Sequence, residues 1–281
     1  MIVWLASYPR SGNTLLRTIL KTTMNQNSYF DEEVNSRVGW SAGEEQLIGH
    51  IARDESFDDF YIKAKNSKEL FLIKTHLPPK DQSPVIYIVR DGRSTLWSYF
   101  QYHRNFIPDA PLSIIELILG MDFYGGWSDH YRTWMCSDRK KLVLTYEELA
   151  GDLGREKLES IAKFLDYSGS IKAWVNPFVE LNKGKPKFFR NGFSEWVSPN
   201  EWTKKINEIF IFIHGNLMDE LGYAPHSTCY HKALSLEDCC LVDIIISGIK
   251  KQKEYEKICS DRLQVINVLD GEIKRLKGLN N

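Results

Sequence analysis

The sequence predicts a three-layer α/β fold built on a doubly wound parallel sheet. Short apolar runs, typical of buried parallel strands, occupy residues 2–5, 70–73, 85–89 and 142–144. Segments with helical spacing of apolar residues lie between these runs, notably at residues 15–24, 94–103 and 154–165. Because ligands of such sheets bind beyond the carboxyl ends of the strands, we expect the functional residues at that edge.

The first predicted strand leads into a turn at residues 8–13, with the sequence YPRSGN, and helical spacing resumes after it. Such a turn leaves backbone N–H groups unpaired at a helix N-terminus, where the helix dipole also favours an anion. Arg10, Ser11 and Thr14 add donors aimed at the same place. The segment therefore predicts a strand, a phosphate-binding turn and a helix, in that order.

The turn differs from the phosphate loop of nucleotide triphosphatases, which has the pattern Gly-x-x-x-x-Gly-Lys followed by Ser or Thr. In this chain Asn13 stands where that lysine would be, and Gly12 is the only glycine of the segment. These differences disfavour a small-molecule kinase that uses ATP and Mg²⁺, which is the alternative interpretation.

Further motifs follow along the chain. They are KTHLP at residues 74–78, VIYIVRDGRSTLWSY at residues 85–99, TYEEL at residues 145–149 and FFRNGFSEW at residues 188–196. With the turn, they resemble in type and order the motifs of the cytosolic sulfotransferases that use 3′-phosphoadenosine 5′-phosphosulfate (PAPS). The resemblance covers residues 2–223. It implies a P-loop NTPase-like fold of the sulfotransferase type, PAPS as donor, adenosine 3′,5′-bisphosphate (PAP) as product, and no metal.

The resemblance implies three catalytic residues, of which His76 is the base. With an ordinary pKa of about 6.5, a neutral imidazole accepts the proton of the acceptor near neutral pH. Arg10 stands where the family usually has a lysine that neutralises the bridging oxygen as the S–O bond breaks, and its planar fork of donors suits a bidentate contact with the phosphosulfate. Lys74 would supply a second cation near the sulfuryl oxygens.

The same resemblance implies the residues that contact the 3′-phosphate of the donor. Arg90 and Ser98, eight positions apart, match the pair that binds this phosphate. Arg190 and Gly192 match the loop that completes the contact, with Gly192 acting through its backbone N–H. Asn191 stands where the family usually has lysine, which removes one charge.

Two aromatic residues, Tyr146 and Phe178, match positions that line the adenine, although aromatics at strand ends are as often part of a core. Leu15 replaces the tryptophan that commonly stacks on the adenine. The complete donor-binding set that the resemblance implies is Arg10, Ser11, Gly12, Asn13, Thr14, Leu15, Arg90, Ser98, Tyr146, Phe178, Arg190, Asn191 and Gly192.

Composition narrows the class of protein. The chain has 281 residues, 43% of them hydrophobic, and a formal net charge of −1, which disfavours a nucleic-acid-binding protein. Five cysteines without Cys-x-x-Cys spacing predict neither a disulfide framework nor a zinc site. Met1 is followed directly by a predicted strand, and no apolar stretch approaches the length of a membrane span. We therefore expect a cytoplasmic enzyme with no membrane contact, in keeping with bacterial secondary metabolism.

The segment from residue 31 to residue 61 has no clear periodicity and carries nine carboxylates against two arginines. One interpretation is a solvated surface, because charge runs mostly face water. The other is a wall of the acceptor pocket, where negative potential attracts an acceptor with an amine or guanidinium group. Both interpretations stay open at this point.

Residues 105–126 contain prolines and glycines typical of a mobile segment, which suits a cap over the acceptor. We expect a sulfotransferase domain over residues 1–224 and a helical tail over residues 225–281. In the tail, apolar residues recur at alternating intervals of four and three. The seam, which Arg262 interrupts, consists of Tyr255, Cys259, Arg262, Ile266, Leu269, Ile273 and Leu276. Such a helix either forms a homodimeric coiled coil or packs on its own domain.

The leading prediction is an enzyme that transfers the sulfuryl group of PAPS to a hydroxyl, amine or guanidine group of a small-molecule acceptor. The kinase described above is the alternative. A third interpretation is a non-catalytic nucleotide-binding scaffold, but such a module has no need of a base, and the chain has Lys74 and His76 in the catalytic motif.

Overall fold

The structure, a computed structural model, describes residues 1–278 except for residues 32–38, 152, 190–194 and 224–234. The chain divides into two compact units, Met1–Thr228 and Cys229–Asn281. The first unit contains a parallel sheet and carries all the motifs named above.

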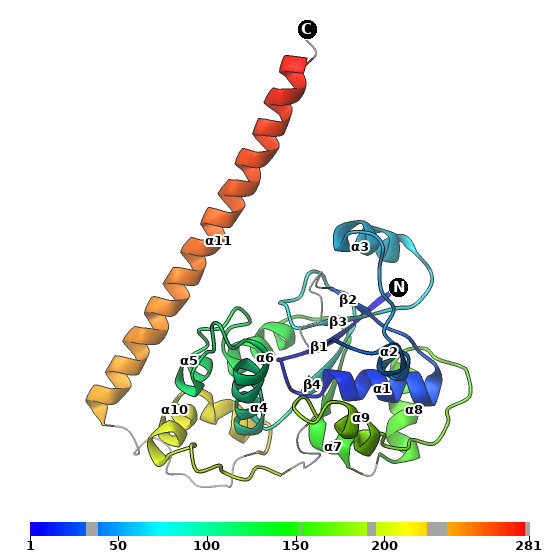
Figure 1. The fold of residues 1–281 in the computed structure, drawn as a ribbon, viewed down its shortest axis with the longest axis horizontal. Coiled ribbons are helices and arrows are strands. Elements are labelled where there is room, and N and C mark those ends of the chain that lie inside the picture. The colour runs from blue at the N-terminus through cyan, green and yellow to red at the C-terminus, as the bar shows by residue number, and fades with distance from the viewer. Residues whose placement is uncertain (32–38, 152, 190–194, 224–234, 279–281) are drawn as a thin grey trace. The chain divides into compact units, whose positions relative to one another are not determined.

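In the described residues, this sheet has five strands in the order β2-β3-β1-β4-β5, and all neighbouring strands run parallel. The strands are β1 (Ile2–Ser7), β2 (Tyr29–Phe30), β3 (Phe71–Thr75), β4 (Val85–Val89) and β5 (Lys141–Thr145). The parallel α/β fold predicted from the alternation of apolar runs is thus confirmed (Figure 1). Among the strands of the described residues, β2 was not predicted, because a strand of two residues is too short to show a hydrophobic pattern.

Helices connect the strands and cover the sheet. They are α1 (Asn13–Met24), α2 (Ala42–Ile48), α3 (Phe57–Asn66), α4 (Gly92–Phe106), α5 (Ile114–Ile118), α6 (Trp127–Met135), α7 (Tyr146–Ala150), α8 (Arg155–Phe164), α9 (Phe178–Gly184) and α10 (Lys204–Glu220). The predicted helices at residues 15–24, 94–103 and 154–165 correspond to α1, α4 and α8.

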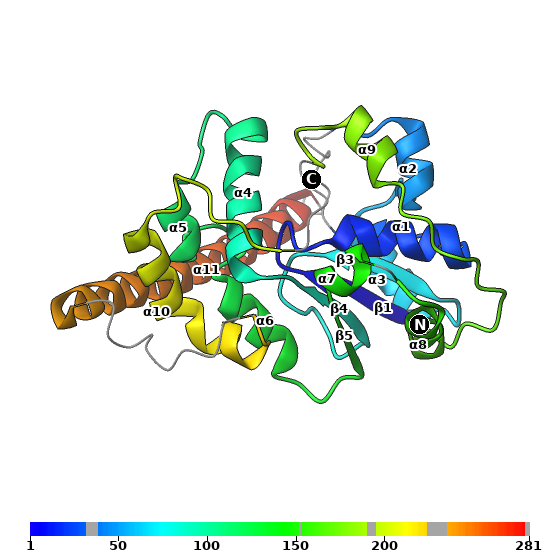
Figure 2. The same cartoon turned by 90° about the horizontal axis from the view of Figure 1, so that it is seen from below.

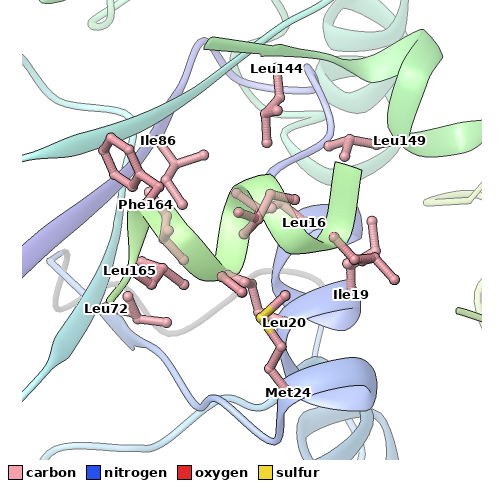
Figure 3. Close-up of a cluster of buried hydrophobic side chains, with 14 of the residues drawn as sticks. Leu16, Ile19, Leu20, Met24, Leu72, Ile86, Leu144, Leu149, Phe164 and Leu165 are labelled. Carbon is pink, nitrogen blue, oxygen red and sulfur yellow. The ribbon is translucent and has the colours of Figure 1, made fainter. Parts of the chain in front are cut away.

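One face of the sheet packs against α1 and α8 to form a hydrophobic core. Leu16 and Ile19 of α1 belong to a buried cluster that also includes Ile86 of β4 and Phe164 of α8 (Figure 3). Their spacing on α1 places the apolar stripe toward the strands, and removal of this surface from water stabilises the layer.

The opposite face of the sheet packs against α6. Alternate strand residues point to this side, since side chains of a strand alternate between faces. Trp4 of β1 and Tyr87 of β4 both pack on Trp134 of α6, with ring centroids 6.4 and 6.5 Å apart. Figure 2 shows α1 and α6 on opposite sides of the strands, which completes the three layers.

The acidic segment at residues 31–61 contains helices that the sequence analysis did not predict. The seven-residue α2 begins at a capping box, in which Ser41 and Glu44 satisfy each other's backbone N–H groups, and α3 begins at the cap residue Ser56. Helix α2 buries only Ile48 and so has no apolar stripe, whereas α3 has one in Phe57, Phe60, Tyr61 and Ala64, which the sequence analysis overlooked among the surrounding carboxylates.

The second unit contains α11 (Leu236–Gly278), a helix of 43 residues. A C-terminal helical segment is therefore confirmed. Three residues of the predicted seam have exposed side chains, with exposed fractions of 60% for Tyr255, 59% for Ile266 and 56% for Leu269. None of the helices in the described ranges has a stretch long and apolar enough to cross a bilayer.

Candidate active site

A cavity of about 710 Å³ opens at the carboxyl ends of β1, β3, β4 and β5. It brings together residues that the sequence analysis selected from separate motifs. Those on its wall are Arg10, Gly12, Asn13, Thr14, Leu15, Lys74, His76, Arg90, Ser98, Tyr146 and Phe178. Ser11 is buried outside the wall, and Arg190, Asn191 and Gly192 lie outside the described residues.

The turn after β1 contains two residues with positive φ, Arg10 and Gly12. Gly12, with φ +108°, caps the N-terminus of α1, and a Cβ atom there would lie 2.7 Å from Cδ2 of Tyr146. Arg10 has a φ of 68°, a left-handed conformation that costs energy in a residue other than glycine. The buried Ser11 hydroxyl has no hydrogen-bond partner among the described residues. The backbone N–H groups of the first turn of α1 are free of intrahelical partners, as at every helix start.

Asn13 has a structural role in this turn. Its side-chain amide donates to the backbone carbonyl of Leu5, at 2.8 Å, and to the Ser7 hydroxyl, at 3.4 Å. The side chain thus ties the start of α1 to β1. The contribution of Asn13 to a bound ligand would therefore come from its backbone.

Two arginines that follow different strands, Arg10 after β1 and Arg90 after β4, meet in the cavity. Nη1 of Arg90 donates to the backbone oxygen of Arg10 at 3.4 Å, and Nε of Arg10 donates to the Ser98 hydroxyl at 3.4 Å. The Arg90 guanidinium lies 4.1 Å from the centre of the Tyr146 ring. Arg10 also contacts Phe188, whose ring centre is 4.0 Å away and whose carbonyl accepts from Nη2 at 2.5 Å. We call the part of the wall formed by Arg10, Gly12, Thr14 and Arg90 the phosphate end.

His76 directly follows β3 and lies on the cavity wall. Its Nδ1–H donates to the backbone carbonyl of Ser7 at 2.7 Å, which leaves Nε2 with its lone pair available. Burial lowers the pKa of His76 well below its ordinary value, and the charge of Lys74 lowers it further. The imidazole is therefore neutral at physiological pH, the state that a general base requires.

Two side chains of α6 hold the backbone around His76. Nε2 of His130 donates to the carbonyl of His76 at 2.9 Å, and the indole of Trp134 donates to the carbonyl of Leu77 at 3.1 Å. The Tyr87 hydroxyl donates to Nδ1 of His130 at 2.7 Å, which fixes the tautomer. Burial lowers the pKa of His130 to about 4, so this residue also stays neutral.

The cavity continues into an aromatic end, which we define by Tyr99, Tyr102, Phe123 and Tyr124. The Tyr124 ring packs edge-on against the His76 ring, with centroids 5.8 Å apart. Two carboxylates also reach the cavity wall, and they are Asp122 and Glu195. Asp122 accepts a hydrogen bond from the Tyr99 hydroxyl at 2.9 Å.

The acidic segment at residues 31–61 had two interpretations, a solvated surface and a wall of the acceptor pocket. Of the carboxylates of residues 31–61 that the structure describes, none lines the cavity. Some are paired with lysines elsewhere, as in the contacts of Glu44 with Lys185 at 3.4 Å and of Asp58 with Lys80 at 2.6 Å. The solvated-surface interpretation agrees with the exposed Asp58 but not with Asp31, which is buried.

The sequence analysis assigned no role to several residues of the cavity wall, among them Arg17, Trp40 and Tyr124. Arg17 had a visible signal, because it is a charged residue three positions after Thr14 on a helix whose neighbouring residues are apolar. Trp40 and Tyr124 had none, since aromatic residues in irregular segments are common in cores and on surfaces alike.

Comparison with known proteins agrees with this architecture. The family model of the sulfotransferase domain matches residues 2–187. The chain belongs to this sulfotransferase family. The matched segment includes the turn at residues 8–13, Lys74, His76, Arg90 and Ser98.

Among characterised relatives, mouse Sulfotransferase 4A1 is 30% identical over 196 residues, covering 63% of this chain and 64% of its own. Human Sulfotransferase 2A1 is 32% identical over 180 residues, 58% of each chain. This chain thus spans less than two thirds of the length of these relatives. The crystal structure of mouse sulfotransferase SULT7A1 complexed with PAP superposes with a TM-score of 0.53 at 22% identity, covering 79% of this chain and 88% of that one, which supports the fold.

Proposed function

We propose that the chain is a PAPS-dependent sulfotransferase that acts on a small-molecule acceptor. The observation that carries the proposal is a single cavity in which Arg10 and Arg90 meet at one end and the neutral base His76 lies on the same wall. The acceptor oxygen or nitrogen attacks sulfur, the S–O bond to the 5′-phosphate breaks, and PAP leaves with the electron pair. The acceptor proton passes to Nε2 of His76.

The chain's own groups suit this donor. The buried Ser11 hydroxyl and the first-turn N–H groups offer donors to the 5′-phosphosulfate, and the close approach at Gly12 explains why no larger residue fits there. Arg90, stacked on Tyr146, would bind the 3′-phosphate with Ser98, and Phe178 would flank the adenine. The protein of the SULT7A1 structure binds PAP, as its description states, which supports the same ligand here.

The test combines binding and turnover. Titration calorimetry with PAP should give a saturable one-to-one signal, and ³⁵S-labelled PAPS should transfer label to a phenolic acceptor without added Mg²⁺. As a control, Arg104→Gln changes an exposed arginine paired with Glu201 outside the cavity wall and should behave as the unmodified chain. Failure to bind PAP, together with turnover of ATP that depends on Mg²⁺, would favour the kinase alternative.

The acceptor proposed here carries a hydroxyl group on a flat or apolar body, because Tyr99, Tyr102, Phe123 and Tyr124 form that part of the wall. A cationic acceptor is the finer proposal, and Asp122 and Glu195 on the wall support it. Comparing turnover of tyramine with that of neutral 4-ethylphenol tests this preference, and equal turnover would contradict it.

We also propose that the chain acts in the cytoplasm as a homodimer joined through α11. Cys136, Cys239, Cys240 and Cys259 are free thiols, as expected in a reducing compartment. The exposed heptad seam of α11 supports pairing with a second copy. Light scattering of the full chain should give the mass of a dimer, and Ile266→Lys with Leu269→Lys should give that of a monomer. A monomeric unmodified chain would contradict the proposal.

A further inference from the structure

Arg17 is a buried cation on the wall of the cavity, and neither the predicted catalytic set nor the predicted donor-binding set includes it. Its side chain is only 3% exposed, and it extends from α1 one turn beyond the phosphate-binding turn. Nε donates to the Ser28 hydroxyl at 2.7 Å, and the guanidinium lies 4.4 Å from the centre of the Phe30 ring. Neither neighbour carries a negative charge.

The guanidinium therefore lacks the partner that a buried charge normally has. Within the described part of the chain, Nη2 of Arg17 has no hydrogen-bond partner, and Arg17 forms no salt bridge. Burial of an unpaired cation is unfavourable, so such groups usually face an anion. The burial lowers the pKa of Arg17 to about 9, which still leaves the group charged at neutral pH.

The surroundings of Arg17 are positive rather than negative. Nζ of Lys74 lies 5.1 Å from the centre of the same Phe30 ring, and both cations are on the cavity wall. His50, stacked on Phe30, has a pKa lowered to about 4 by burial and by the charges of Arg17, Arg53 and Lys74. A region in which several cations act on one imidazole attracts an oxyanion.

We propose that Arg17 forms, beside Lys74 and Phe30, an oxyanion-binding subsite on the cavity wall. The ligand is a sulfate-like, phosphate or carboxylate group, bound through charge-assisted hydrogen bonds to the guanidinium. Two sources supply this chemistry, namely the sulfuryl group of the donor and an anionic substituent of the acceptor. The inference rests on the proposed function, because the donor and the acceptor that carry these groups are the substrates of that reaction.

Three variants test the subsite. Arg17→Met removes the charge and most of the donors, Arg17→Lys keeps the charge without the planar fork, and Arg53→Gln removes a neighbouring cation that is not on the cavity wall. Thermal unfolding of each ligand-free protein comes first. Because Arg17→Met relieves an unpaired buried charge, its melting temperature should not fall, whereas a purely structural role in holding Ser28 and Phe30 would lower it.

Binding and turnover measurements then distinguish the two sources of the oxyanion. If the oxyanion is the sulfuryl group, Arg17→Met weakens binding of PAPS by about 10- to 100-fold and leaves PAP unchanged, since PAP lacks that group. If it belongs to the acceptor, PAPS and PAP bind as before, and kcat/KM falls by a similar factor for 3-(4-hydroxyphenyl)propionate but not for 4-ethylphenol. In either case, Arg17→Lys should lose less affinity or kcat/KM than Arg17→Met does, and Arg53→Gln should lose none.

The inference is overturned if Arg17→Met changes PAPS, PAP and both acceptors by one common factor, or changes none of them. It is also overturned if that variant unfolds at a lower temperature and keeps its ligand preferences once folded. These outcomes differ from failure of the proposed function, in which the unmodified chain itself would neither bind PAP nor transfer label.

Discussion

The phosphate end and the aromatic end of the cavity are built in different ways. The phosphate end comes mainly from one short turn, in which Gly12 with φ +108° and Arg10 with φ 68° set the direction of the chain. The aromatic end comes from α4 and the segment after α5, whose side chains meet only because the chain folds. Local backbone geometry thus specifies one end, and packing between distant segments specifies the other.

The largest effect is expected at His76. Replacement of His76 by Ala removes the proposed base, so transfer from PAPS should fall by about 10²–10⁴-fold in kcat. The affinity for PAP should stay within a factor of about two, because the phosphate end is built from other residues. Turnover assays measure kcat, and titration calorimetry on the same preparation measures the affinity for PAP. An equal loss of PAP binding and turnover would mean that the ends are not separable.

A change within the phosphate end should act on donor binding. Gly12→Ala introduces a Cβ atom 2.7 Å from Tyr146 Cδ2 at a φ of +108°, so the turn or the tyrosine has to move. We expect PAP affinity to fall by about 10- to 100-fold, in line with a cost of about 1–3 kcal/mol.

The matched control for that change is Gly43→Ala. Gly43 lies in α2 with open space around its Cα and no positive φ, so the change should leave PAP affinity unaltered. If Gly12→Ala binds PAP as well as Gly43→Ala does, the close approach has no bearing on the ligand.

A smaller effect is expected from the support behind the base. His130→Ala removes the donor to the carbonyl of His76, so the imidazole is held less firmly and kcat should fall by about 10-fold with KM for PAPS unchanged. His130→Gln, whose amide can reach the same carbonyl, should recover most of this loss. If both variants lose activity equally and melt at the same lower temperature, the role of His130 is confined to stability.

The smallest effect is a displaced pH profile. Because burial and Lys74 lower the pKa of His76, its neutral form persists below the ordinary pKa of about 6.5. With an acceptor alcohol that does not ionise, kcat should therefore stay level between about pH 7.5 and 6.0 and decline only in more acidic buffer. An acid limb centred near pH 6.5 would show that the ligand-bound site no longer lowers this pKa.

The comparison between the two ends also explains what could be predicted. The strands, α1 and the turn were predictable because their signals lie within a few residues, as for the apolar run before Arg10. The direction of the Asn13 side chain was not, since its partners on β1 become neighbours only through the turn. For Arg17, the sequence shows a charge on a helix but not that it is buried. The capping box that starts α2 was visible in the residues Ser41 and Glu44, yet an apolar stripe was the feature sought.

The hydrogen bonds from α6 to consecutive carbonyls at His76 and Leu77 have an evolutionary consequence. They anchor the backbone at His76 to α6, while Tyr124 of the aromatic end packs on the imidazole itself. Mutation of the exposed Phe123 can therefore change the range of accepted molecules while the backbone hydrogen bonds at His76 persist. The architecture allows substrate preference to diversify while the chemical step is inherited unchanged.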